Sequence, residues 1–176
     1  SRPIFQYNTI RLNLINGLTR FEFIVSKLLL ILLISLVSLL VVFAAGLIIG
    51  LNNSDTTTGV QMMDHSIFLF GYFIELLLYL NFALLVGIWL KRTGISIFVV
   101  LIYPLLVEPL LRWQFPDSID KFFPIKAMDQ LIVFPFPKYV GIEVPDTIPI
   151  LAIVIGITWI IILFLLSNLI LSRKNL

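Results

Sequence analysis

The run Leu28–Leu51 constrains the fold most, because it holds no charged residue and consists mainly of Leu, Ile, Val and Phe. A helix needs about 20 residues to cross the hydrocarbon core of a bilayer. On an insertion scale, each such apolar residue near the helix centre contributes roughly −0.3 to −0.6 kcal/mol. The run is therefore predicted to form a membrane-spanning helix.

Three further runs have the length and apolar character of membrane spans. In the whole chain, 60% of the residues are hydrophobic and 12% are charged, whereas ordinary soluble domains carry about 25% charged residues. A soluble fold cannot cover its surface with so few charges, so the soluble globular and disordered classes are excluded. We expect an all-α, polytopic integral membrane protein with four transmembrane helices. The predicted spans are 28–51, 67–90, 95–111 and 148–171.

The third predicted span, 95–111, is the least regular of the four. It contains Pro104 and Pro109, with Glu108 between them. Proline lacks an N–H group and its ring clashes with the carbonyl four residues earlier, which bends or breaks a helix. We therefore expect this span to be kinked. By contrast, Pro149 opens the last span, where a proline suits the first turn.

Basic residues are distributed unequally between the two sides that four spans define. One side comprises 1–27, 91–94 and 172–176, and it holds eight basic residues and one acid. The other side comprises 52–66 and 112–147, with four basic residues and seven acids. The positive-inside rule therefore places both ends of the chain in the cytoplasm. This predicts a multi-pass protein of the cell inner (plasma) membrane.

The cytoplasmic segment 1–27 begins with a short amphipathic pattern. Such a helix either lies on the lipid surface or docks into a groove of a cytoplasmic partner, and the residues alone leave both interpretations open. At about 100° per residue, the apolar face comprises Tyr7, Ile10, Leu14 and Ile15, whereas Thr9, Asn13 and Asn16 lie on the opposite face with Leu12 at its edge.

Two signals predict where this helix ends and where the first span begins. Gly17 follows Asn16 and suits the left-handed position that ends a helix. Thr19 and Glu22 have the spacing of a capping box, in which the threonine side chain accepts from the backbone and the glutamate reaches back. A new helix is therefore expected to start at Thr19 and to run into the membrane.

Residues 7–33 read YNTIRLNLINGLTRFEFIVSKLLLILL. This segment resembles the cytoplasmic coupling helix and the following span of the ABC-2-type permeases of ABC transporters. The later segments LNFALLVGIWLKRTG and LIYPLLVEPLLRW resemble the next two spans of such permeases. The resemblance covers essentially the whole chain. The polar positions that carry it are Thr9, Arg11, Gly17, Thr19, Arg20, Glu22 and Lys27.

This resemblance implies a transmembrane permease subunit of an ATP-driven exporter. Its partners would be nucleotide-binding ATPase subunits and a second permease copy or homologue. ATP and Mg²⁺ would bind on the ATPase, so this chain is expected to hold no cofactor of its own. Such permeases normally have six spans with the coupling segment after the second, so the chain is expected to lack the first two. The residues assigned to ATPase coupling are Asn8, Thr9, Arg11, Leu12, Asn16, Gly17 and Arg20.

The outer segment 112–147 combines five prolines with interleaved aromatic residues. Pro135 and Pro137 interrupt its most apolar part, 131–142, so that part cannot form a straight span. We expect short interfacial or re-entrant helices with aromatic side chains at the depth of the headgroups. ABC-2-type permeases carry a re-entrant hairpin at the corresponding place. An ordinary aromatic-rich external loop is the alternative.

Glu75 and Glu108 are the ionisable residues inside the predicted spans. A charge in the bilayer is costly, so such residues are functional candidates. Arg112 follows Glu108 by four residues and could pair with it near the outer boundary. Glu75 lies about 12 Å into its span at 1.5 Å per residue. Glu75 and Glu108 are both candidates for a substrate path.

Several classes of function are excluded because their motifs are missing. The chain has no Gly-x-x-x-x-Gly-Lys-Ser/Thr phosphate loop, so it is not itself the ATPase. It has no cysteine and one histidine, which excludes thiolate and His-rich metal sites, and it has no basic stripe for nucleic acid. We expect no catalytic residues. Two alternatives stay open: a non-catalytic membrane scaffold or assembly subunit, and an integral membrane enzyme that uses Glu75 or Glu108.

Overall fold

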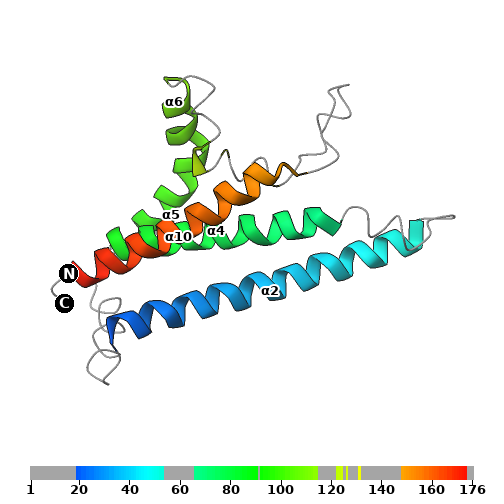
Figure 1. Ribbon diagram of the computed structural model, residues 1–176, viewed down its shortest axis with the longest axis horizontal. Helices are drawn as coiled ribbons and strands as arrows, with labels where there is room; N and C mark the ends of the chain where they lie inside the picture. The colour runs from blue at the N-terminus through cyan, green and yellow to red at the C-terminus, as the bar shows by residue number, and fades with distance from the viewer. Residues whose placement is uncertain are drawn as a thin grey trace.

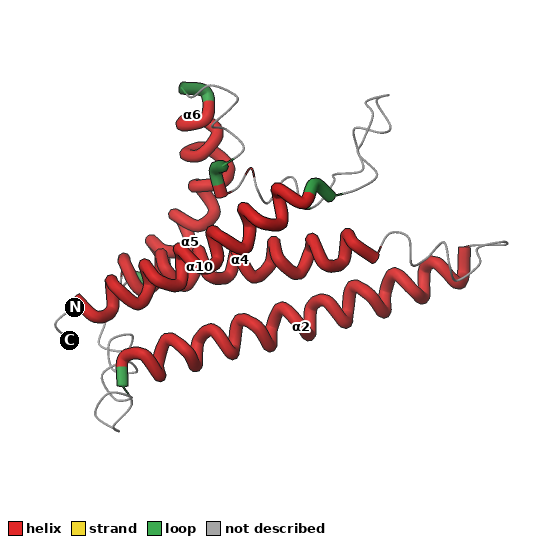
Figure 2. The backbone as a smooth tube through the Cα atoms, viewed as in Figure 1, coloured by secondary structure: helices red, strands yellow, loops and turns green. Residues whose placement is uncertain are grey.

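The computed structural model describes residues 19–53, 66–90, 92–114, 122–124, 126, 131 and 148–173. Within these ranges the chain is helical and contains no strand (Figures 1 and 2). The all-α prediction is therefore confirmed for the described part. The helices are α2 (Arg20–Asn53), α4 (Ser66–Leu90), α5 (Thr93–Ile102), the π-helical segment η1 (Tyr103–Val107), α6 (Glu108–Arg112) and α10 (Ile150–Arg173).

Four helical stretches of the described part are long and apolar enough to cross a membrane. The expectation of four helices compatible with a membrane is therefore confirmed. The third stretch is α5, η1 and α6 taken together, so the irregularity expected near Pro104 is a π-helical turn. The stretches are Phe21–Gly50, Ile67–Leu90, Thr93–Arg112 and Ile150–Arg173.

The start of α2 has the predicted capping box. The backbone N–H of Thr19 donates to Oε2 of Glu22 at 2.7 Å. In return, the backbone N–H of Glu22 donates to Oγ1 of Thr19 at 3.2 Å. These bonds satisfy two of the donors that the start of a helix leaves free. From this point α2 continues unbroken for 34 residues, so one helix joins the capping box to the far end of the bundle.

The long helices α2, α4 and α10 run side by side (Figure 1). Helices α4 and α10 run in the same direction, and α2 runs in the opposite one. The start of α2, the start of α5 and the C-terminal ends of α4 and α10 therefore lie at one end of the bundle. This arrangement agrees with an even number of spans. It also places Lys27, Arg92 and Arg173 toward the same end, because they lie near those helix ends.

Buried apolar side chains form three clusters along the bundle. Elsewhere α2, α5 and α6 expose many Leu, Ile, Val and Phe side chains, as expected for helices whose solvent is hydrocarbon. From the basic end, the clusters are Phe23, Ile24, Ile88 and Leu171; then Leu78 and Leu163; then Ile74, Leu131, Ile148 and Ala152.

Glycine allows close contacts between α4, α10 and the outer segment. A Cβ atom at Gly156 of α10 would lie 3.1 Å from Cγ2 of Ile74 on α4, and small residues of this kind let membrane helices approach each other. A Cβ atom at Gly71 of α4 would lie only 2.5 Å from the backbone carbonyl oxygen of Leu131. Any larger residue at position 71 would therefore displace the chain at Leu131.

The third span departs from the direction of the other three. Figure 1 shows α5 starting beside the end of α4 and then rising, through the π turn, away from the layer of long helices to α6. Its packing against α4 includes the Phe82 and Tyr103 rings, whose centres are 4.9 Å apart. The π turn thus lies where this span leaves the rest of the bundle.

Candidate functional site

Most of the residues predicted to couple to an ATPase lie outside the described residues. Arg20 is the first residue of α2, and only its backbone is described. The amphipathic coupling helix therefore stays a prediction, and the intramembrane acids are the candidate sites that the structure describes. The undescribed residues are Asn8, Thr9, Arg11, Leu12, Asn16 and Gly17.

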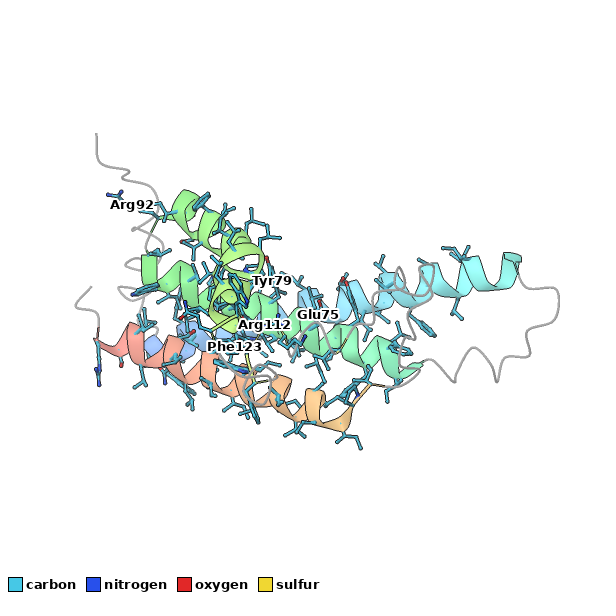
Figure 3. The ribbon with its side chains drawn as sticks, turned by 90° about the horizontal axis from the view of Figure 1, so that it is seen from above. Glu75, Tyr79, Arg92, Arg112 and Phe123 are labelled. Carbon is cyan, nitrogen blue, oxygen red and sulfur yellow. The ribbon has the colours of Figure 1, made fainter. Side chains whose placement is uncertain are left out.

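Glu75 lies in the first half of α4, with Tyr79 one turn further along the helix (Figure 3), and Tyr72 precedes Glu75 by three residues. Their spacing of three and four residues places these side chains on one helix face. The Tyr72 hydroxyl shares a 2.6 Å hydrogen bond with Oγ of Ser38 on α2. The Tyr79 hydroxyl donates to the carbonyl oxygen of Val100 on α5 at 3.4 Å. Glu75, whose Oε2 atom is buried, therefore lies where polar groups of α4 reach toward two neighbouring helices.

Glu108 is the first residue of α6, and its side chain is fully buried, with 0% of its surface exposed. Its Oε1 atom accepts a 2.9 Å hydrogen bond from the backbone N–H of Lys126. The carboxyl group also hydrogen-bonds with the side chain of Tyr103. Donors at this distance offset part of the cost of burying a carboxylate. The ion pair predicted between Glu108 and Arg112 stays a prediction.

Two side chains from different spans hold the backbone of the outer segment 112–147. Glu108, at the start of α6, binds the N–H of Lys126. Trp159 of α10 donates from Nε1 to the carbonyl oxygen of Phe122 at 2.8 Å. Trp159 lies about 14 Å along α10 from its first residue at 1.5 Å per residue. The described residues of the outer segment thus contact the bundle well inside its length, while the predicted hairpin falls mainly outside the described residues.

Tyr79, Tyr103 and Trp159 contribute to these contacts, and the sequence patterns did not single them out. Each combines an aromatic ring with one polar atom inside an apolar span. Buried tyrosine hydroxyls and tryptophan N–H groups usually find a hydrogen-bond partner. That rule marks all three as residues that link elements, although it does not say which elements they link.

The chemistry available here is that of two separate carboxyl groups. Glu75 belongs to α4 and shares a helix face with Tyr72 and Tyr79, whereas Glu108 belongs to α6 and lies beside the side chain of Tyr103. A carboxyl group in such surroundings can exchange a proton or hold a cationic group, which is why intramembrane acids mark transport paths in other membrane proteins. Among the described residues, no group of three or more His, Cys, Asp or Glu side chains could hold a metal ion.

No protein-family model, curated protein or solved structure matches this chain. The resemblance to ABC-2-type permeases therefore rests on the residues quoted above, and the activity that it implies is a proposal. The structure contributes the membrane-compatible helices, the capping box and the surroundings of the two acids.

Proposed function

We propose that this chain is the transmembrane permease subunit of an ATP-driven ABC transporter, and that it exports its substrate with separate ATPase subunits. The capping box carries the proposal, because Thr19 and Glu22 are among the positions on which the resemblance rests, and their side chains form the expected pair of hydrogen bonds. The helix begins directly after Thr19. A push on the segment before it would therefore be delivered to the end of α2.

The continuity of α2 supports a mechanical role. A helix without interruption transmits a push as a rigid body, and rigid-body rotation is a common form of switching. Closure of two ATPase subunits on ATP would push the coupling segments of paired permease chains. The chains would then rock and open a path to the outside. In this mechanism the energy comes from the partner, and the chain supplies the lever and the path.

The distribution of charge supports a cytoplasmic partner at the basic end of the bundle. Lys27, Arg92 and Arg173 lie toward that end, which the positive-inside rule assigns to the cytoplasm. The proposed docking surface comprises Asn8, Thr9, Arg11, Leu12, Asn16, Gly17 and Arg20. Both ends of the chain would face the cytoplasm, and the outer segment would form a re-entrant hairpin on the other side. Glu75, on the face of α4 that contacts two other helices, would line the substrate path.

Copurification tests the proposal directly. The chain would be tagged and purified from its native membrane in mild detergent, and the associated proteins identified by mass spectrometry. We expect an ATPase with a phosphate-binding loop, present in equal amount with the permease. A defined complex that lacks any ATPase would contradict the proposal and would favour a membrane scaffold or assembly subunit instead.

A variant of the docking surface tests the role of the segment itself. Burial of one leucine contributes roughly 1.5–3 kcal/mol, so Leu12→Asp should weaken the ATPase complex by about 10- to 150-fold. Asn13→Asp is the matched control, because it adds the same charge next to Leu12 without removing an apolar group. If Leu12→Asp leaves binding and ATPase stimulation unchanged, the segment does not dock the ATPase.

A further inference from the structure

The third span changes its hydrogen-bond pattern between two prolines. At the end of α5, the backbone N–H of Tyr103 donates to the carbonyl of Val99, which is the α-helical pattern. At the end of η1, the N–H of Glu108 donates to the carbonyl of Tyr103, five residues earlier. Pro104 is the second residue of this turn, and Pro109 follows Glu108 directly after it. A π turn accommodates one residue more than an α turn and is frequent at functional sites.

Pro104 leaves a carbonyl without its usual donor, and α4 supplies another. In an unbroken α-helix the carbonyl of Val100 would accept from the N–H of residue 104, which proline lacks. The Tyr79 hydroxyl donates to this carbonyl instead. In hydrocarbon an unsatisfied backbone group is costly. Tyr79 therefore makes the interruption at Pro104 tolerable at this position in the bundle.

The π turn also decides which side chain of α6 faces the outer segment. Successive residues of an α-helix are about 100° apart. With the extra residue of the π turn in place, Glu108 faces Tyr103 and the N–H of Lys126. Without it, everything after the turn would rotate by about 100°. Val107 would then occupy the present position of Glu108.

We propose that the π turn that contains Pro104 and precedes Pro109 is a register-setting device, which rotates α6 so that the buried Glu108 carboxyl group holds the outer segment at Lys126. Glu108 is here a positioning residue, and the prolines act through it. The alternative register would turn a carboxylate toward the exposed apolar surface of α6, where charge is costly in lipid. The two registers therefore differ in whether the acid lies inside the protein. This inference concerns the chain alone and does not depend on an ATPase partner.

Nitroxide scanning of α6 tests the register. The chain has no cysteine, so single cysteines can be placed at Val107, Leu110 and Leu111 without further changes. Accessibility to oxygen would be measured for the full chain in lipid nanodiscs. In the unaltered chain all three positions should be accessible, since their side chains are 39%, 59% and 40% exposed.

Replacement of both prolines should move this pattern by one residue. In Pro104→Ala/Pro109→Ala, the label at Val107 should become shielded, because it takes the buried position of Glu108. The label at Leu111 should become partly shielded at the half-buried position of Arg112, while Leu110 stays accessible at the position of Leu111. Pro149→Ala is the matched control, because Pro149 directly precedes α10 and its missing N–H replaces no helical donor. An unchanged pattern in a folded double variant, as judged by gel filtration and circular dichroism, would overturn the proposal.

Tryptophan emission provides a second measurement that needs no bulky label in α6. In a Trp89→Phe/Trp113→Phe background, Trp159 is the remaining tryptophan of the three, and its N–H donates to the carbonyl of Phe122. Loss of the hydrogen bond between the Lys126 N–H and Glu108 should alter the contact between Trp159 and Phe122. The emission maximum should therefore shift with the double proline replacement and with Glu108→Ala. A shift with Glu108→Ala but none with the double replacement would show that the prolines do not act through Glu108.

Discussion

The hydrogen bond between Tyr79 and Val100 predicts an unusual dependence between two residues on different helices. Tyr79→Phe removes the hydroxyl that donates to the Val100 carbonyl. A protein hydrogen bond contributes about 0.5–1.5 kcal/mol net, and bonds between membrane helices average about 0.6 kcal/mol. At 3.4 Å this bond is long, so we expect a loss of about 0.5–1 kcal/mol. That corresponds to about a two- to fivefold change in the unfolding equilibrium.

Pro104→Ala should abolish most of this cost. Alanine restores an N–H at position 104, which can donate to the Val100 carbonyl as in an ordinary α-helix. Tyr79→Phe should then cost close to nothing, so the two replacements should show a coupling energy about as large as the bond itself. For replacements at independent sites, the changes in the free energy of unfolding add to within about 0.3–0.5 kcal/mol. The coupling energy between positions 79 and 104 should exceed this deviation.

The four proteins of this double-mutant cycle would be unfolded reversibly in mixed micelles and followed by circular dichroism. Tyr72→Phe is the matched control, because it removes a tyrosine hydroxyl from the same face of α4 but breaks the bond to Ser38. Its cost should be equal in both backgrounds. If Tyr79→Phe costs the same with proline or alanine at position 104, the hydroxyl does not replace the missing donor.

Three further predictions concern packing, capping and topology. Gly71→Ala should destabilise the fold by about 1–3 kcal/mol, as overpacking does, because its Cβ would lie 2.5 Å from a backbone carbonyl oxygen. Gly46→Ala is the control and should not destabilise the fold, because its Cβ would have nothing within 4 Å. Equal unfolding curves for the two variants would contradict the close contact at Gly71. Thr19→Ala should cost about 1 kcal/mol through loss of the cap, with Thr19→Ser as the rescue in thermal unfolding. Cysteines at Ser172 and Thr57 should react with an impermeant maleimide from opposite sides of the membrane, and reaction from one side would contradict the four-span topology.

The features that could be predicted from the sequence are those that depend on neighbouring residues. Span length is a property of one continuous run, so the four membrane-compatible helices follow from the apolar stretches. The capping box depends on Thr19 and Glu22, three residues apart. An interruption near Pro104 follows from the chemistry of proline. In each case the physical cause lies within one or two turns of its effect.

The contacts of the candidate site could not be predicted in the same way, because they join distant residues. Glu108 binds the backbone of a residue 18 positions away, and Trp159 binds one 37 positions away. Helix α4 is apolar on nearly all sides, so its pattern does not indicate which face packs against α10 and which faces lipid. Spacing along one helix indicates Arg112 as a partner for Glu108, because such spacing reports only the contacts that a helix makes with itself.

These contacts have a common physical origin in the bilayer. Lipid chains are as apolar as leucine, so the hydrophobic effect inserts the helices but does not select how they pair. Selection then depends on small residues and on the few polar groups that need a partner. Among the residues that the structure describes, Tyr72, Tyr79, Glu108 and Trp159 are groups of this kind that form a contact between elements. The residues that hold the helices together are therefore also the residues whose rearrangement would let the helices move, and the proposed transport mechanism would act through them.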